Sequence, residues 1–385
     1  MGLLFLHGMA MAVWFVPLGS VLDAADLGSI KPMAFAASAF AALLSPLLFG
    51  AIADRSVPPA KVLRWISAAT GIVMCLIAWS IEWQVSGWAI WMLIQVQSLF
   101  CSPTSSLAGS IVFAQLVRSK RSYGLIRSMG TIGWMTGCWT TSLLGFDASP
   151  HAFFVSGSLF LFLAFFTLRL PHHEIVNAHP QKLTLRERFG WDALSLLRHH
   201  DHRVVFVTAA LLAVPFAAFY PFTPPHLSDL GMEHISAWMS LGQVSEVIAL
   251  MSMGAILGKW KFKWIVTVGI GFGVLRYGLY AINSTVPVLF GLTLHGFAFT
   301  LTYISTQIYL AERIEAGWRT RAQALLSLMT SGFGNLVGYL GTGVWLTLCS
   351  SNGHTDWSVY WGGLTFLVLI VLLFFVSSYH GKPTA

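Results

Sequence analysis

Apolar runs of roughly 20 residues recur along the whole chain, and each is long enough to cross the hydrocarbon core of a bilayer as a helix. The sequence predicts twelve of them, centred near residues 13, 43, 72, 101, 134, 160, 214, 246, 272, 299, 335 and 367. Only 10% of the residues are charged, whereas a soluble domain carries about a quarter. We therefore expect an all-α membrane protein with twelve transmembrane helices.

Positive charge is concentrated in alternate connections between these helices. All but three of the 22 lysines and arginines lie there or in the C-terminal tail. Connections rich in Lys and Arg stay on the cytoplasmic side, so the pattern predicts that both termini are cytoplasmic. Topology thus accounts for the formal net charge of +7, and we predict no interaction with nucleic acid.

The longest polar stretch, from Arg169 to Arg203, separates six predicted helices from six. We predict an N-terminal six-helix bundle at 1–170, a cytoplasmic linker with an amphipathic helix at 171–202, and a C-terminal six-helix bundle at 203–385. The segment "FGAIADR" ends the second helix and is echoed by "MGAILGK" at the end of the eighth, which indicates a duplication. Two such bundles are typical of secondary transporters. Glycines in the fifth and eleventh helices should let neighbouring backbones approach closely.

The linker is also rich in histidine, with His172, His173, His199, His200 and His202. Their spacing matches no closed zinc site, so we predict a solvated segment and no metal site. The four cysteines are scattered and form no disulfide framework. Nothing in the chain predicts a cofactor.

Glu246 is the only carboxylate that the sequence places in the middle of a predicted helix. A charge at the bilayer centre costs at least about 2.5–3.5 kcal/mol, so this side chain should face a partner or a water-filled cavity. Gln243 lies three residues earlier on the same helix face. This polar spot predicts a binding site or, alternatively, a protonated glutamate bonded to a neighbouring helix.

Two arginines also lie within predicted helices. Arg127 is followed on the same face by Thr131 and then by Trp134. Arg127 either snorkels to the interface or offers a fixed fork of donors to hydroxyls or a carboxylate in a cavity. For Arg276, nearer the outer end of the ninth helix, we favour snorkelling or a structural role.

Histidines and aromatic rings supply further candidates. His7 in the first helix and His295 in the tenth could line a cavity, or each could be a packed and hydrogen-bonded histidine. Phe299 lies one turn beyond His295, as Trp134 lies one turn beyond Thr131. Because they share faces with polar candidates, Phe299 and Trp134 are the rings that we expect to stack on a flat ligand.

The segment "FGAIADR" ends the second helix at the membrane surface and contains Gly50, Asp54 and Arg55. There a carboxylate can pair with another helix and hold an inner gate shut. The motif is similar to the loop motif between helices two and three of the major facilitator superfamily. Together with twelve helices, a division into six and six, and a long central loop, it predicts the major facilitator fold.

More specific motifs narrow this likeness. The stretches "IRSMGTIGW", "GQVSEV" and "RAQALLSLMTSGFG" occur in order, with "LRYGLYA" and "HGFAF" between the last two. The chain resembles the bacterial nucleoside:proton symporters of that superfamily along nearly its whole length. The resemblance implies that certain positions contact the nucleoside. These are Arg127, Thr131, Gln243, Glu246 and Phe299, with Trp134 where an aromatic residue is expected.

The chain departs from the family pattern at several of these sites. Thr300 stands where family members can carry an aspartate, and His295 replaces a tyrosine. Ala217 and Tyr220 stand where a polar pair is expected. Since Thr300 cannot titrate, proton coupling should rest on Glu246 alone.

We predict a secondary transporter of the inner membrane that imports nucleosides by alternating access, coupled to protons, and that acts as a monomer in the lipid bilayer. Its substrate-binding residues are Arg127, Thr131, Trp134, Gln243, Glu246, His295 and Phe299. Two alternatives stay open: an importer of another small polar solute, such as a sugar or a modified nucleoside, and a proton-driven efflux pump, since an aromatic cavity with one acid also suits cations. An enzyme is not expected, because no ionisable groups cluster at the membrane interface.

Overall fold

Helices make up nearly all of the described chain. The computed structural model describes residues 1–385 apart from 54–56, 116–122, 171–190, 316–317, 352 and 382–385, and it gives only the backbone of 45–53, 113–115, 123–125 and 191. Each residue on which the sequence centres a predicted span lies in a helix. Eight of the described helical segments are long and apolar enough to cross a membrane. The prediction of a helical membrane protein is confirmed at this level.

The chain forms two compact units. Unit 1 comprises Met1–Leu183, Tyr220–Pro225 and Met232–Ser240, and unit 2 comprises Thr184–Phe219, His226–Gly231 and Leu241–Ala385. Two short segments from beyond the central linker therefore belong with the N-terminal part of the chain. The predicted boundaries at 1–170, 171–202 and 203–385 do not include this exchange and stay a prediction.

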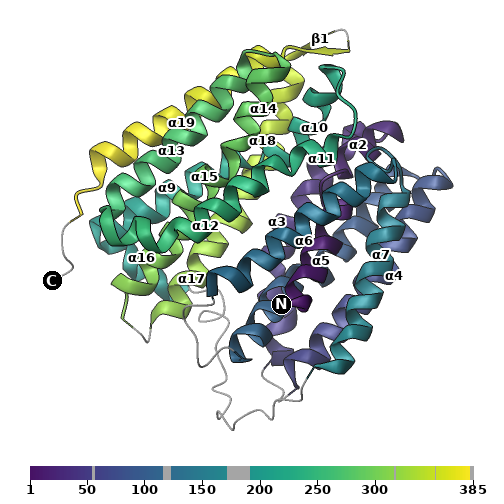
Figure 1. Cartoon of the computed structure of the whole chain (residues 1–385), viewed down its shortest axis with the longest axis horizontal. Helices are drawn as coiled ribbons and strands as arrows, with labels where there is room; N and C mark the ends of the chain where they lie inside the picture. The colour runs from purple at the N-terminus through teal and green to yellow at the C-terminus, as the bar shows by residue number, and fades with distance from the viewer. Residues whose placement is uncertain (54–56, 116–122, 171–190, 316–317, 352, 382–385) are drawn as a thin grey trace. The chain divides into compact units, whose positions relative to one another are not determined.

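Most helices of unit 1 come from the start of the chain, which is purple to blue in Figure 1. They are α1 (Gly2–Phe15), α2 (Leu18–Ala24), α3 (Lys31–Ala53), α4 (Pro59–Glu82), α5 (Gly87–Gln115), α6 (Tyr123–Leu143) and α7 (His151–Phe166), with the short α11 (Ile235–Met239). The 3-10 turns η1 (Gly28–Ile30) and η3 (Thr167–Arg169) lie next to α3 and α7.

Glycines set the closest helix contacts of unit 1. A Cβ atom added to Gly8 of α1 would lie 2.1 Å from the carbonyl oxygen of Gly130 in α6, and one added to Gly133 would lie 2.0 Å from that of Phe5. Gly71 of α4 and Gly157 of α7 oppose each other in the same way. Small residues allow such contacts between helices in lipid. The expectation for the glycine-rich fifth helix, which is α6, is confirmed.

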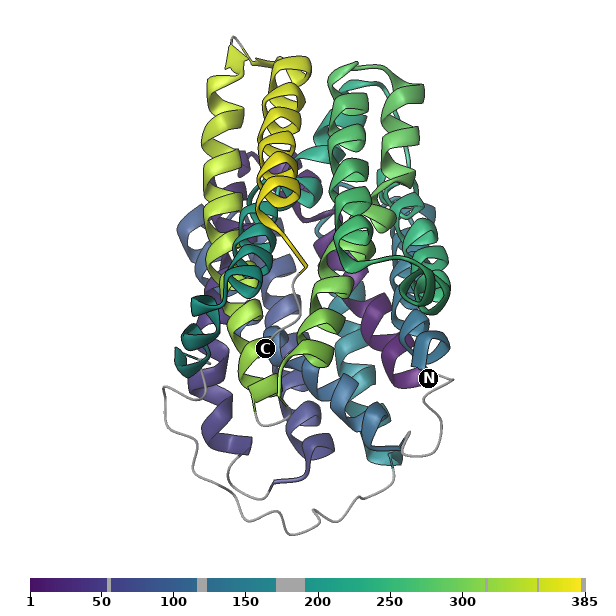
Figure 2. The ribbon, with the colours of Figure 1, turned by 90° about the vertical axis from the view of Figure 1, so that its left-hand side faces the viewer.

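Unit 2 contains the remaining helices. They are η4 (Trp191–Arg198), α9 (His200–Phe216), α12 (Leu241–Lys259), α13 (Phe262–Ala281), α14 (Thr285–Thr293), α15 (His295–Phe299), α16 (Ser305–Arg313), α17 (Arg319–Ser327), α18 (Asn335–Leu348) and α19 (Trp357–Ser378). Residues of α10 (Phe219–Asp229) belong to both units. The strands β1 (Ser350–Ser351) and β2 (His354–Thr355) pair between α18 and α19. The yellow α19 runs lengthwise beside other helices of this unit, α13 among them (Figure 2).

Two of the long helical segments of unit 2 contain π-helical turns. The segment η5 (Thr300–Ile304) continues α15, and η7 (Leu328–Gly334) joins α17 to α18. Short π turns inside α-helices are frequent at functional sites. An added Cβ on Gly338 would lie 2.7 Å from the carbonyl oxygen of Val214 in α9, so the predicted eleventh helix also allows close backbone approach.

The predicted amphipathic helix of the linker lies largely outside the described residues. Its described end, η4, is a 3-10 helix from Trp191 to Arg198.

Candidate functional site

The candidate residues of unit 1 lie on one stripe of α6. Arg127, Thr131 and Trp134 are spaced by four and three residues, which places them on a single helix face. The glycines that pack against α1 lie on an adjacent face of the same helix. The stripe lies beside this packing face, with Arg127 exposed and the other two side chains half-buried.

Trp134 belongs to a small aromatic cluster within unit 1. Its ring centroid lies 5.8 Å from that of Tyr220 and 6.2 Å from that of Phe15, and the latter two lie 5.1 Å apart. The indole Nε1 of Trp134 is buried and has no hydrogen-bond partner among the described residues. Buried polar groups are nearly always paired, so this donor is a group that a ligand could satisfy. The sequence did not identify Phe15 as a member of the cluster.

The candidate residues of unit 2 gather where α12 and α15 touch. A Cβ atom added to Gly296 would lie 2.0 Å from the backbone nitrogen of Glu246 and 2.5 Å from the carbonyl oxygen of Gly242. Ser245 fixes this crossing, since its hydroxyl donates to the carbonyl of Gly242 (2.9 Å) and accepts the backbone N–H of Gly296 (3.0 Å). The backbones therefore hold Glu246 and His295 in fixed relation to each other.

Burial differs among the side chains at this crossing. Gln243 is 3% exposed and His295 is 7% exposed. Glu246 and Phe299 are half-buried. The ring of Phe299 is nearly parallel to that of His295, at an interplanar angle of 13° and a centroid distance of 6.3 Å. Gln243 and Glu246 thus lie on a helix that crosses the one carrying His295 and Phe299, and their shared role in substrate binding stays a prediction.

His295 is held by a buried arginine and an aromatic ring. Its Nδ1 atom is hydrogen-bonded to Nη1 of Arg276, and its ring stacks on Phe219 at 3.8 Å and 12°. Because guanidinium nitrogens only donate, Nδ1 is the acceptor and the ring hydrogen lies on Nε2. A second proton could be placed on Nδ1 only by breaking this bond.

Arg276 does not snorkel, and that part of its predicted role is wrong. Its side chain is 0% exposed, and its guanidinium lies 4.7 Å from the ring centroid of Phe216 and 4.3 Å from that of Tyr277. A desolvated guanidinium gains from such aromatic faces. The structural alternative therefore holds, and the link to His295 was missed because it joins two different helices.

Thr300 begins the π-helical segment that follows α15. It is 0% exposed, and its hydroxyl has no hydrogen-bond partner among the described residues. This neutral side chain stands at the position for which the resemblance implies an acid in other family members.

His7 is a packed histidine. Its Nε2 is hydrogen-bonded to the hydroxyl of Thr104 at 2.8 Å, and that hydroxyl donates to the carbonyl oxygen of Cys101 at 2.6 Å. Of the predicted gate, Gly50 lies within α3, whereas Asp54 and Arg55 lie outside the described residues.

Comparisons with known proteins decide the family. The sequence model of the family described as nucleoside H⁺ symporter matches residues 2–382. The chain belongs to the nucleoside H⁺ symporter family. It is 32% identical to the putative nucleoside transporter YegT of Escherichia coli K12, over 97% of this chain and 92% of that protein.

Two further members are more distant. The nucleoside permease NupG of Escherichia coli K12 is 25% identical over 93% of this chain and 89% of its own length. The xanthosine permease of the same organism is 24% identical over 98% and 95%. A crystal structure of NupG superposes with a TM-score of 0.86 at 23% identity, covering 99% of this chain and 98% of that one. The fold is therefore that of the nucleoside transporter NupG.

As a nucleoside H⁺ symporter, the chain is a membrane transporter and not an enzyme. Symport means that the nucleoside and the proton cross the membrane in the same direction, which confirms the predicted activity. The alternatives of a sugar importer and an efflux pump are set aside, whereas a modified nucleoside stays open as the substrate.

Proposed function

We propose that Glu246 both contacts the nucleoside and carries the coupled proton. The observation that supports this role is its place in the fold: a half-buried carboxylate near the middle of the apolar segment Ile235–Lys259, on the same helix as the buried amide of Gln243 and across the crossing from His295. Among the described residues, every other Asp and Glu lies near the end of a helix or between helices. Thr300 offers no second acid at membrane depth.

Hydration would drive the proton on and off this side chain. A carboxylate withdrawn from water favours its neutral, protonated form, whereas a wet cavity favours the ionised form. Alternating access would expose Glu246 to each side of the membrane in turn, so that it loads a proton on one side and releases it on the other. His295 is a poor substitute, because Arg276 already occupies its Nδ1 lone pair.

The substrate contacts that we propose are the seven residues predicted from the sequence. They are Arg127, Thr131, Trp134, Gln243, Glu246, His295 and Phe299. The polar groups would bond ribose hydroxyls and base edges, and Trp134 or Phe299 would stack on the base. Stacking of a base on an aromatic side chain is worth about 1–3 kcal/mol in nucleic-acid-binding proteins. The buried Nε1 of Trp134 supports a further donor contact.

The remaining features of this proposal rest on the sequence. They are import across the inner membrane by a monomer, twelve spanning helices with both termini cytoplasmic, and an inner gate that involves Gly50, Asp54 and Arg55. The charge pattern supports the topology.

A single variant tests the role of Glu246. Glu246→Gln keeps the shape and a hydrogen-bonding end but cannot titrate. In proteoliposomes it should retain exchange of labelled uridine or adenosine between equal pools, yet lose accumulation driven by an inward proton gradient. Glu233→Gln is the matched control, because Glu233 is exposed between α10 and α11 and should behave as the parent protein. Accumulation by Glu246→Gln against a nucleoside gradient would assign the proton to another group.

A further inference from the structure

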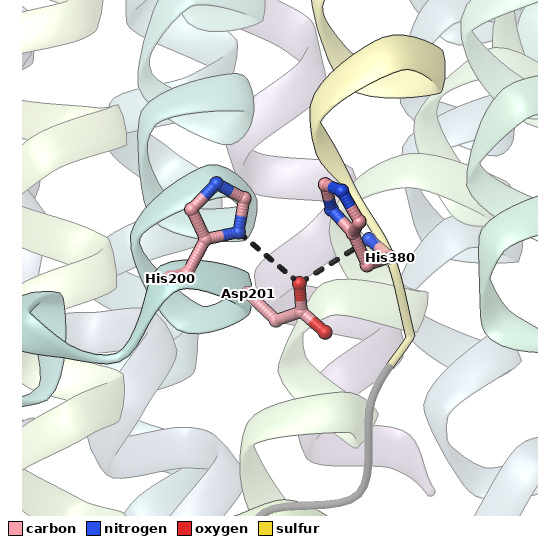
Figure 3. A group of neighbouring side chains, drawn as sticks. All are labelled: His200, Asp201 and His380. Carbon is pink, nitrogen blue, oxygen red and sulfur yellow. Dashed lines mark hydrogen bonds and ion pairs between the residues drawn. The ribbon is translucent and has the colours of Figure 1, made fainter.

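Three potential metal ligands lie together outside the transport site. His200 and Asp201 begin α9, and His380 follows the end of α19 (Figure 3). Their ligand atoms, one for each residue, all lie within 4.8 Å of one another. Nδ1 of His200 and Oδ1 of Asp201 are 3.4 Å apart, and the two imidazole rings meet edge to face at 5.1 Å. All three belong to unit 2.

The backbone around Tyr379 holds His380 in this place. The side chain of Tyr379 is 2% exposed and stacks on Phe375 at 5.2 Å and 16°. Its carbonyl oxygen accepts a hydrogen bond from Nζ of Lys263 at 2.8 Å. The next residue, His380, donates its backbone N–H to Oδ1 of Asp201 at 3.2 Å. The two chain segments that carry the ligands are therefore brought together before any ion binds.

The hydrogen bonding of His380 also fixes which ring nitrogen can bind a metal. Its Nδ1 lies 2.6 Å from the carbonyl oxygen of Ser378. A carbonyl can only accept, so Nδ1 carries the hydrogen and the lone pair lies on Nε2. Histidines that bind metals usually donate their other ring N–H to a carbonyl or carboxylate in this way, which orients the ring.

The spacing and the exposure of the group suit a transition-metal ion. A tetrahedral ion with bonds of about 2.0–2.1 Å holds its ligand atoms roughly 3.3–3.4 Å apart. His200 and Asp201 already have this separation, and because His200 and His380 are exposed, small adjustments of their side chains can close the rest. Two imidazoles and one carboxylate suit Zn²⁺ and related ions, with a position left for water.

The geometry points to a binding site for one divalent transition-metal ion formed by His200, Asp201 and His380. The ion would tie the segment after α19 to the start of α9. The sequence predicted no metal site because it considered the spacing of the linker histidines alone. Asp201 and His380 are 179 residues apart along the chain, and only the fold brings them together.

Zinc binding to the full-length protein tests the site. The protein should carry no histidine tag, and His172, His173 and His179 of the linker should be replaced by Gln, since they could bind Zn²⁺ themselves. Calorimetry with Zn²⁺ should then give one ion for each chain and a higher unfolding temperature, because an ion that binds only the folded state stabilises it.

Variants separate the proposed site from adventitious binding. His200→Ala and His380→Ala should each weaken Zn²⁺ binding at least about tenfold, since loss of a ligand's hydrogen-bond partner alone typically costs 10–100-fold. His199→Ala is the matched control, because this exposed neighbour lies outside the cluster and should leave binding unchanged. Asp201→Asn keeps an acceptor for the backbone of His380, so it should lose Zn²⁺ affinity while the apo protein unfolds at the parent temperature. No Zn²⁺ binding, or equal binding by the parent and His200→Ala/His380→Ala, would overturn the site.

Discussion

Glycine packed against backbone forms both of the close helix crossings beside the candidate residues. The two crossings differ in how far the candidate residues take part in them. At α1–α6 in unit 1, glycines meet backbone, and of the polar stripe Trp134 reaches the crossing with its backbone nitrogen, 3.2 Å from a Cβ added to Gly8. At α12–α15 in unit 2, Gly296 meets the backbone of Glu246, so the candidate residues are part of the crossing itself. In unit 2 the fold and the candidate site share the same contacts, whereas in unit 1 the exposed Arg127 can be changed separately from the helix crossing.

The two regions also differ in hydrogen bonding, because partners within the unit fix more of the polar groups in unit 2 than in unit 1. In unit 2, Ser245 joins α12 to Gly296, and Arg276 fixes the ring of His295. In unit 1, Arg127 is exposed and Nε1 of Trp134 has no partner among the described residues. Unit 2 therefore offers preorganised polar groups, and unit 1 offers groups that a ligand can still order.

The largest expected effect comes from adding a methyl group at the α12–α15 crossing, which tests whether this contact holds the fold of unit 2. Gly296→Ala places a Cβ 2.0 Å from the backbone of Glu246, where nothing can move aside without shifting a helix. Overpacking usually costs about 1–3 kcal/mol, and we expect the free energy of unfolding to fall by at least the upper value, with loss of uptake. Thermal unfolding and transport assays measure both.

Gly254→Ala is the control for this variant. Gly254 lies in α12 with nothing within 4 Å of an added Cβ, so the variant should be as stable as the parent or slightly more stable. Normal stability and uptake of Gly296→Ala would show that the crossing is looser than the structure has it.

The two arginines give the next test, because one is buried in unit 2 and the other is exposed in unit 1. Arg276→Ala should lower the free energy of unfolding by about 2–3 kcal/mol, since His295 loses its donor and the rings of Phe216 and Tyr277 lose packing. Arg127→Ala should change stability by less than about 0.5 kcal/mol. It should weaken nucleoside binding at least tenfold, as expected for about 1.5 kcal/mol or more from a charged hydrogen bond.

Calorimetric titration with nucleoside and chemical unfolding separate these effects. Unchanged affinity of Arg127→Ala would return that residue to the snorkelling role. An undiminished stability of Arg276→Ala would mean that desolvation of the guanidinium offsets its contacts.

The smallest expected effect concerns Trp134. Trp134→Phe keeps an aromatic face but removes the buried Nε1–H, so nucleoside affinity should fall about fivefold, which corresponds to about 1 kcal/mol for one neutral hydrogen bond. Trp139→Phe on the same helix is the control, because its Nε1 already donates to Ser240 at 2.9 Å. Equal affinities for the parent and Trp134→Phe would limit the role of Trp134 to stacking.

Much of the candidate site follows from the sequence because it depends on positions within single helices. The lone acid Glu246, its neighbour Gln243 on the same face, and the stripe from Arg127 to Trp134 are set by hydropathy and by 3.6 residues per turn, which are local properties. The membrane class and the family were predicted for the same reason, since spans and motifs are contiguous in the chain.

Tertiary structure decided which partners these residues meet. Arg276 is bonded to His295 from another helix, His7 is bonded to Thr104 across 97 residues, and His380 lies beside Asp201. Each contact depends on how two helices rotate and cross when their side chains interlock, and no local pattern fixes that rotation. The sequence by itself thus determined which residues are polar at membrane depth, and only packing between distant segments determined which are paired, buried or available to a ligand.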